Sequence, residues 1–497
     1  MIGPLALLTA LVVGVLGGDV LGPGPARLLL GAAIVALVFA GERARRELRR
    51  AALVGAVIGV ALLGASVEQR ALNGLVRSPL TRAVARGDSA ELVVTLTDDP
   101  AGPLYRTEVL ATVERIDGRA GGDRTVLVSA SGDEQSALRV LETGDRLRLR
   151  GRLVPLRGFS TRFRWRHAVG RVEVEKVTAV GAPVPPQLVI ANGARHAVLR
   201  GADVLPATPR ALLAGFVLGD TRAIPSDLVS AFRDAGLSHL LAVSGANVAF
   251  ALAIVEPFLR RLRLGARFAG GIAVLVVFGT MTRWEPSVLR ASVMAGLVMG
   301  ARLLGRPADS RRVLVLAMLA LLVLDPFLLH SVGFLLSCGA CAGIVIGSAR
   351  ISARLRGPAW WRDALGVTAS AQIGVAPVVL MVFGTMPLVA LPANLLAAPF
   401  VGPLTIWGIV ASVVGGVLGP AVGLWLQLPT LAMLRGVEWI ARLAARVPIA
   451  VGPAEAVALT AVGVAVVGRH RVRSYLTGRV GGHGRRLRGE GKRPRPA

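Results

Sequence analysis

Apolar segments long enough to cross a bilayer recur along most of the chain. Three open the sequence, at about 4–18, 27–40 and 51–65. The hydrocarbon core of a bilayer is about 30 Å thick, which roughly 20 helical residues span. Later apolar runs predict roughly eight to ten further helices, some short or re-entrant, and they lie at about 238–257, 267–281, 286–304, 312–328, 331–348, 364–382, 388–418, 421–434 and 446–467. The pattern predicts a polytopic α-helical membrane protein.

A different pattern separates the two apolar groups. Apolar and polar residues alternate there in five short bursts, which is typical of strands with one buried face. The bursts cover 90–97, 105–116, 124–130, 146–153 and 171–177. Five strands in about a hundred residues suit a small barrel such as the OB-fold. We therefore expect an inserted β-barrel domain of OB-like form.

The distribution of charge predicts which side of the membrane each part faces. The chain carries 57 Lys and Arg residues against 30 Asp and Glu residues. Arginines at 43–50 separate the second and third apolar segments, and the positive-inside rule places such a loop in the cytoplasm. The β-domain should therefore lie outside the cytoplasm. Its many arginines suit contact with a phosphate backbone, whereas the scarcity of aromatic residues between them argues against base stacking.

These patterns divide the chain into four parts. We expect N-terminal transmembrane helices over 1–67, the extracytoplasmic OB-like domain over 68–190 and a second transmembrane domain over 191–467. The tail over 468–497 is rich in Arg and Gly, a composition that cannot bury a core, so it should be disordered and cytoplasmic.

Polar residues gather where the second transmembrane domain begins. The segment 237–247 contains His239, Ser244 and Asn247. If a helix starts at Ser238, these side chains share one face, and a polar stripe in a membrane helix predicts a bundle interior or a pore. Gly245 allows a close approach of the backbone. Alternatively, these groups satisfy one another and the backbone.

The residues just before this segment are also polar. The spacing over 226–234 predicts an interfacial or re-entrant amphipathic helix, with Arg233 and Asp234 on its polar side. Asp220 and Arg222 precede it. We expect the two carboxylates to pair with arginines, because an unpaired carboxylate inside the membrane costs desolvation.

The stretch 218–247 resembles the signature of the ComEC-type competence family. Similar patterns follow in the same order downstream, at 286–291, 303–306, 325–337, 372–377 and 392–399. The resemblance implies a channel of the bacterial inner membrane that passes single-stranded DNA into the cytoplasm during natural transformation. It also implies contact with membrane lipids, an outer DNA-receptor protein, a cytoplasmic ATP-driven translocase and a possible separate nuclease.

A polyanion crosses hydrocarbon only along a protein-lined aqueous route, so cationic and hydrogen-bonding groups should line the path. Arg222, Arg233 and Arg290 are the cationic candidates, although Arg290 has the alternative of reaching the interface near Trp284. Neutral candidates are Asn247, Gln372 and Asn394. Asn394 lies between Pro392 and Pro399, where we expect a broken helix.

The sequence departs from the family pattern in two ways that bear on chemistry. After Ser244-Gly245 the family commonly has Leu-His, whereas this chain has Ala246-Asn247, which removes an ionisable group. No His-x-His-x-Asp-His cluster occurs, and none of the six histidines has metal-ligand spacing. We therefore expect no nuclease activity, no metal site, no cofactor and a channel rather than an enzyme.

Two other functions stay open. The same polar helix and arginines suit a transporter or flippase for an anionic small or lipid-linked solute. An intramembrane serine hydrolase is the second alternative, with Ser244 as nucleophile and His330 as base, and it requires these two side chains to lie within hydrogen-bond reach.

Overall fold

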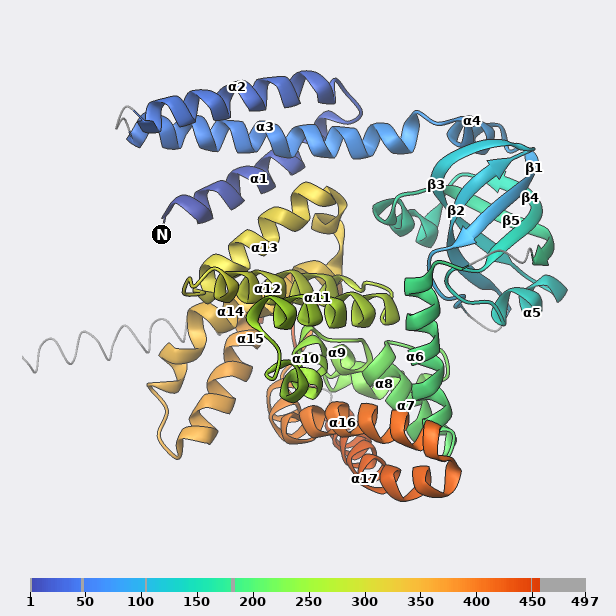
Figure 1. The fold of residues 1–497 in the computed structure, drawn as a ribbon, viewed down its shortest axis with the longest axis vertical. Coiled ribbons are helices and arrows are strands. Elements are labelled where there is room, and N and C mark those ends of the chain that lie inside the picture. Colours follow the sequence, from blue (N-terminus) through green and yellow to red (C-terminus); the bar gives the residue numbers. More distant parts are fainter. Residues whose placement is uncertain (1, 46–48, 103–104, 180–183, 448, 456–497) are drawn as a thin grey trace, which may run out of the picture.

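Helices dominate the molecule, and one small barrel projects from them (Figure 1). The computed structural model describes residues 2–45, 49–102, 105–179, 184–447 and 449–455. Among these residues, six helices are long and apolar enough to cross a membrane. They are α1 (Ile2–Leu21), α3 (Arg49–Val76), α11 (Leu264–Met281), α14 (Val332–Ser352), α15 (Ala359–Phe383) and α16 (Ala390–Leu418). The predicted fold class, a multi-pass helical protein with a small barrel, is confirmed.

The three N-terminal apolar segments form three helices. Between α1 and α3 the chain forms α2 (Ala26–Arg45), and α3 packs against both α1 and α2. A Cβ added to Gly14 meets the Ala61 carbonyl oxygen at 1.9 Å, so α1 and α3 are in close backbone contact. No proline occurs between Arg49 and Ser78, and α3 runs on to Val76, past the apolar segment itself.

The alternating bursts form a closed five-stranded barrel. Its strands are β1 (Ser89–Leu96), β2 (Thr107–Ile116), β3 (Arg119–Ala130), β4 (Arg146–Val154) and β5 (Ala168–Ala179). They pair in the order β1-β2-β3-β5-β4, and β4 pairs back to β1. Only β3 and β5 run parallel. Residues on β4 alternate between buried and exposed, as the period of two predicts.

Three short helical segments accompany the barrel. They are α4 (Pro79–Arg86), α5 (Asp133–Arg139) and the 3₁₀ segment η1 (Gly158–Arg166), which connects β4 to β5. In Figure 1, η1 projects from the barrel toward the helical part of the molecule. Leu92, Val94, Leu147 and Leu149 are almost fully buried inside the barrel.

The second helical domain contains further helices beside the apolar ones. They are α6 (Pro186–Ala202), α7 (Ala207–Leu218), α8 (Ser226–Asp234), α9 (Ser238–Leu241), α10 (Gly245–Leu259), α12 (Pro286–Leu303), α13 (Ser310–Leu324), the 3₁₀ segment η2 (Pro326–His330) and α17 (Pro420–Ala445). The short strands β6 (Met386–Pro387) and β7 (Ala450–Val451) pair with each other. The predicted helix over 226–234 is confirmed as α8, whereas α6 and α7 were not predicted.

Two helix predictions are wrong. The chain does not form one helix from Ser238 onward: α9 ends at Leu241, Ala242 is extended, and α10 starts at Gly245 with Ser244 as its N-cap. Nor is the helix around Asn394 broken, because α16 is continuous through Pro399 and Pro403. The predicted tail over 468–497 lies outside the described residues.

Candidate functional site

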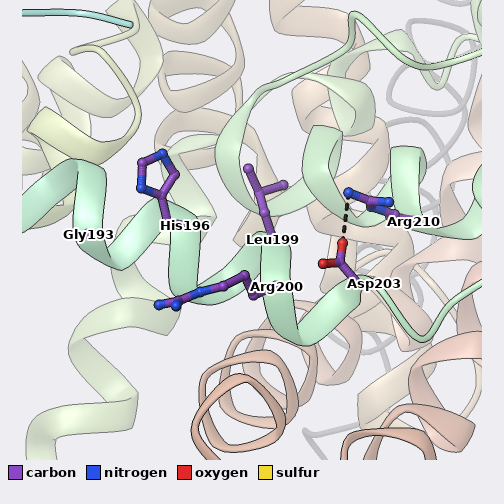
Figure 2. Close-up of a pocket in the computed structure, with 6 residues that line it drawn as sticks. All are labelled: Gly193, His196, Leu199, Arg200, Asp203 and Arg210. Carbon is purple, nitrogen blue, oxygen red and sulfur yellow. Dashed lines mark ion pairs between the residues drawn. The ribbon is translucent and has the colours of Figure 1, made fainter. Parts of the chain in front are cut away.

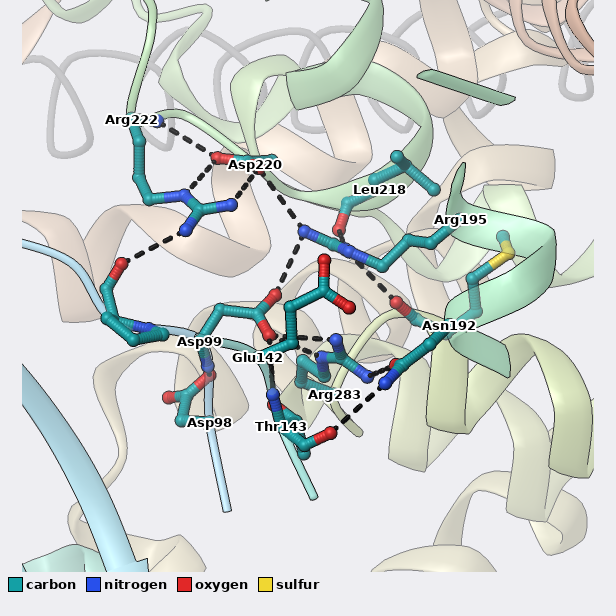
Figure 3. Close-up of polar contacts among 12 residues, drawn as sticks. Asp98, Asp99, Glu142, Thr143, Asn192, Arg195, Leu218, Asp220, Arg222 and Arg283 are labelled. Atoms are coloured by element: carbon teal, nitrogen blue, oxygen red, sulfur yellow. Dashed lines mark hydrogen bonds and ion pairs between the residues drawn. The ribbon is translucent and has the colours of Figure 1, made fainter. Parts of the chain in front are cut away.

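Charged side chains concentrate where the barrel meets the helical domain (Figure 3). Asp99 follows β1, Arg195 lies on α6, Asp220 and Arg222 follow α7, and Arg283 follows α11. The guanidinium of Arg195 lies 2.9 Å from Asp99 and 3.3 Å from Asp220. Arg283 lies 2.8 Å from Asp99. Two of these ion pairs join the barrel to the helical domain, at α6 and after α11, and the third joins α6 to the segment after α7.

Asp99 is the centre of this junction. Its side chain is only 12% exposed and also accepts a hydrogen bond of 2.9 Å from the Thr143 hydroxyl. Burial alone raises the pKa of a carboxyl group, but here the charge of Arg195 and the hydrogen bond from Arg283 outweigh burial. Together they lower the pKa of Asp99 to about 2. The carboxylate is therefore ionised at physiological pH and holds both guanidinium groups.

Two of the predicted site residues belong to this junction. Asp220 pairs with Arg222 and Arg195, so the expected pairing of this carboxylate with arginine is present. Arg222 also donates a hydrogen bond of 3.0 Å to the Pro100 carbonyl in the barrel. Burial raises the pKa of Asp220, but the hydrogen bonds from Arg222 and the charges of Arg222 and Arg195 together outweigh burial and lower this pKa. These two residues hold the domains together.

The predicted polar stripe over 239–247 does not form a single face. Asn247 is 3% exposed, and its amide donates a hydrogen bond of 2.6 Å to the Phe216 carbonyl on α7. Ser244 donates to the Asn247 side-chain oxygen at 3.1 Å. His239, before the break, is exposed instead. Ser244 and Asn247 thus satisfy each other and the backbone, which was the alternative reading of this segment.

Arg290 lies inside the helical domain and is 5% exposed. Its guanidinium donates to the Ser337 hydroxyl and to the Cys341 sulfur, each at 2.9 Å. The alternative of reaching the interface near Trp284 is therefore wrong. No carboxylate pairs with Arg290 among the described residues, so a buried cation is held by neutral groups alone.

The remaining predicted residues are dispersed. Arg233 and Asp234 are exposed on α8, opposite its buried Leu228 and Phe232. Gln372 is half-buried on α15, and Asn394 donates to the Ala390 carbonyl of its own helix. The structure therefore brings Asp220 and Arg222 together, and Ser244, Gly245 and Asn247 together, but it does not gather the full predicted set.

A basic and aromatic segment that the sequence analysis did not single out occupies η1. Phe159 is 92% exposed there. Arg157, Arg162 and Arg164 are exposed around it, and no carboxylate pairs with any of them within the described part of the chain. The signal was present in the sequence, because 158–166 reads Gly-Phe-Ser-Thr-Arg-Phe-Arg-Trp-Arg, which alternates aromatic and basic residues near its end.

The same segment rests on the helical domain. Trp165 stacks on His330 of η2, with ring centroids 3.8 Å apart and ring planes 10° apart. It also meets Phe327 edge to face at 5.4 Å. Leu72 and Leu75, near the end of α3, belong to the same buried cluster. The exposed groups of η1 are therefore fixed beside the membrane helices.

A hollow of about 370 Å³ lies on the outward face of α6 (Figure 2). His196, Arg200 and Arg210 line it. Arg210 pairs with Asp203 at 2.7 Å, and His196 contacts Glu142 of the barrel at 2.7 Å. Arg200 is exposed in it. The hollow is open and basic, and it lies close to the junction.

The geometry gives no support to hydrolase chemistry at Ser244. The Ser244 hydroxyl donates to Asn247, whereas His330 is stacked on Trp165 in a different part of the molecule. A nucleophile and its base must lie within hydrogen-bond reach.

Comparison with known proteins places the helical domain in a family. The competence protein family matches residues 216–473. ComE operon protein 3 of Bacillus subtilis (strain 168) is 26% identical over 225 residues, which are 44% of this chain and 28% of that protein. Uncharacterized protein YcaI of Escherichia coli (strain K12) is 27% identical over 235 residues, which are 43% of this chain and 31% of that protein. These matches span under a third of each relative, and no solved structure matches the chain.

Proposed function

The chain belongs to the competence protein family, and on this premise we propose that it forms an inner-membrane channel through which single-stranded DNA enters the cytoplasm during natural transformation. The inserted barrel and the six described helices that are long and apolar enough to span a membrane suit this role. A transporter or flippase for a small anion needs no such barrel, and no observation favours that alternative.

The position of η1 is the observation that carries the proposal. In OB-type barrels the connection between the fourth and fifth strands is one of the loops that bind oligonucleotides. Here that connection presents Phe159 for base stacking, which is worth about 1–3 kcal/mol per base. Arg157, Arg162 and Arg164 offer exposed guanidinium groups for phosphates, and none of them pairs with a carboxylate within the described residues. Because Trp165 fixes η1 against η2, a strand bound there lies next to the membrane helices.

Arg290 supports the proposal from inside the helical domain. A buried guanidinium without a counter-ion is costly, and charged residues at such positions mark ion and substrate paths. Gly245 lies beside this group, since an added Cβ there meets the Arg290 guanidinium at 3.0 Å. In the described arrangement Asn247 of α10 is buried against α7, and Arg290 of α12 is buried against α14. Passage of a strand therefore requires these helices to separate, which exposes the guanidinium to phosphate.

Binding of a fluorescent single-stranded oligonucleotide to the full chain in lipid nanodiscs tests whether η1 contacts DNA. The triple variant Arg157→Ala, Arg162→Ala, Arg164→Ala removes three phosphate contacts. The slope of log affinity against log salt should then become shallower by about 2, at roughly 0.7 per contact. Phe159→Ala should weaken binding roughly 5- to 150-fold by loss of stacking.

A matched triple variant serves as control. Arg148, Arg150 and Arg152 are exposed on β4, where Arg148 and Arg150 face Glu91 and Glu175. Their replacement by Ala changes net charge equally and should leave the slope nearly unchanged. Equal effects of the two triple variants, or no binding at low salt, contradict the proposal.

A gene deletion in a naturally competent host tests the channel role itself. The deletion should preserve surface binding of labelled donor DNA and abolish its internalisation. Unimpaired transformation refutes the channel role.

A further inference from the structure

Three potential metal ligands from distant parts of the chain converge beside the membrane helices. Asp19 lies near the end of α1, Glu68 on α3 and His330 at the end of η2. Each offers one ligand atom, and these atoms all lie within 4.8 Å of one another. Their distance along the sequence explains why histidine spacing gave no sign of them.

Glu68 gives independent evidence that something binds here. Its side chain is fully buried, at 0% exposure, and neither carboxylate oxygen has a hydrogen-bond partner. The Nε2 atom of His330 is also buried without a partner. An unsatisfied carboxylate in a membrane helix is costly and marks a functional site. A proton on Glu68 removes the charge, and a small side-chain shift lets that proton bond to His330 Nε2, but the second Glu68 oxygen still has no partner.

We infer that Asp19, Glu68 and His330 bind one divalent transition-metal ion of the Zn²⁺ class. Two carboxylates and a neutral imidazole balance the charge of a divalent cation. Imidazole favours Zn²⁺ and its neighbours, whereas Mg²⁺ and Ca²⁺ favour oxygen ligands alone. Ligand bonds of about 2.0–2.2 Å bring ligand atoms to roughly 3–4 Å from one another, so side-chain shifts of about an ångström close the site. Asp19 and His330 are half-buried and give the ion access.

Neighbouring residues already orient the histidine. Its ring stacks on Trp165 at 3.8 Å between centroids, so the imidazole cannot rotate freely. A bound ion joins α1 and α3 to η2 and, through Trp165, steadies η1. The role assigned is structural: the ion fixes the N-terminal helices and the barrel segment to the helical domain. This site is separate from the DNA contacts proposed above, and its test stands if DNA fails to bind.

The test measures Zn²⁺ binding by the full chain in detergent after removal of metal with a chelator. Wild-type protein should bind about one Zn²⁺ per chain by mass spectrometry of the metal. Asp19→Asn, Glu68→Gln and His330→Gln should each weaken binding at least tenfold. Glu438→Gln and His196→Gln are matched controls away from the site and should bind normally. Lack of Zn²⁺ binding by wild type, or equal binding by site and control variants, overturns the proposal.

A second measurement needs no variant. Co²⁺ bound by this nitrogen and oxygen set should give visible absorption bands, and one equivalent of Zn²⁺ should remove them. Zn²⁺ should also raise the thermal unfolding midpoint of metal-free protein, and Mg²⁺ should not. Absence of the Co²⁺ bands, or equal stabilisation by Mg²⁺ and Zn²⁺, overturns the assignment.

Discussion

At Asp99, one carboxylate pairs with two guanidinium groups that come from different segments of the helical domain. Arg195 and Arg283 are 6% and 7% exposed, so neither charge is solvated if the carboxylate is lost. Removing one member of a buried ion pair typically costs about 3–5 kcal/mol, because the partner is left uncompensated. The junction between barrel and helical domain therefore depends on this side chain more than on any exposed pair.

Asp99→Asn should lower the thermal unfolding midpoint of the full chain in detergent, by an amount that reflects a cost of about 3–5 kcal/mol. Asp203→Asn is the control, because its partner Arg210 is half-exposed and such pairs contribute about 1 kcal/mol or less.

The dependence of stability on pH supplies a second measurement of the role of Asp99. The pKa of Asp99 falls from 3.8 to about 2 on folding, so its stabilisation is present above about pH 4 and is lost as pH falls toward 2.

Wild-type protein should therefore lose more stability between pH 4 and pH 2 than Asp99→Asn does. Equal losses in the two proteins, or equal midpoints for the Asn variants at positions 99 and 203, contradict this role of Asp99.

Residue-level chemistry was only partly predictable from the sequence. The pairing of Asp220 with arginine was predicted correctly, and Arg222, which was predicted to line a path, is one of its partners. The other partner, Arg195, was missed, since its contact with Asp220 depends on how α6 packs against the end of α7. Arg290 was expected to line a path, with the membrane interface as its alternative, and its burial among neutral groups excludes the interface.

At the scale of elements, α6 and α16 cross at almost backbone contact. A Cβ added to Gly201 on α6 meets the carbonyl oxygen of Ser412 on α16 at 1.7 Å. Gln427 of α17 completes the contact, because its amide donates to the Gly201 carbonyl at 3.2 Å and to the Ser412 hydroxyl at 2.9 Å. Only glycine permits this approach.

Gly201→Ala should therefore lower the free energy of unfolding by about 1–3 kcal/mol through overpacking. Gly193→Ala is a control on the same helix, since nothing lies within 4 Å of its added Cβ. That control should be neutral or raise stability by about 0.5–1 kcal/mol, as alanine favours the helix. Thermal unfolding of both variants in one detergent compares them, and similar midpoints contradict the close crossing.

Periodic elements were predictable and irregular ones were not. The five strands and α8 follow from local alternation, which one buried face imposes on the sequence. The break between α9 and α10 was missed because Ala242 and Val243 are apolar and suit a helix, and only the Ser244 cap and Gly245 mark a new start. η1 was missed because nine residues without apolar periodicity read as a loop.

At the scale of the whole molecule, α3 fixes the orientation of the barrel. This helix has 28 residues and is therefore about 42 Å long, which exceeds the roughly 30 Å hydrocarbon core. Its N-terminal end follows the basic segment at 43–50, and its C-terminal end leads through α4 into the barrel. Figure 1 shows the barrel at the opposite end of α3 from α2's C-terminal end. The two ends must lie on opposite sides of the membrane.

Cysteine labelling tests this orientation. In a Cys338→Ala, Cys341→Ala background, Ser131→Cys places a thiol on an exposed loop of the barrel, and Ala44→Cys places one at the exposed end of α2. The basic segment retains its positive charge on the cytoplasmic side. A membrane-impermeant maleimide should therefore label Ser131→Cys in intact spheroplasts and Ala44→Cys only after lysis. Labelling of Ala44→Cys before lysis, with or without labelling of Ser131→Cys, contradicts the assigned topology. The barrel would then not be shown to face outward, where it could receive DNA.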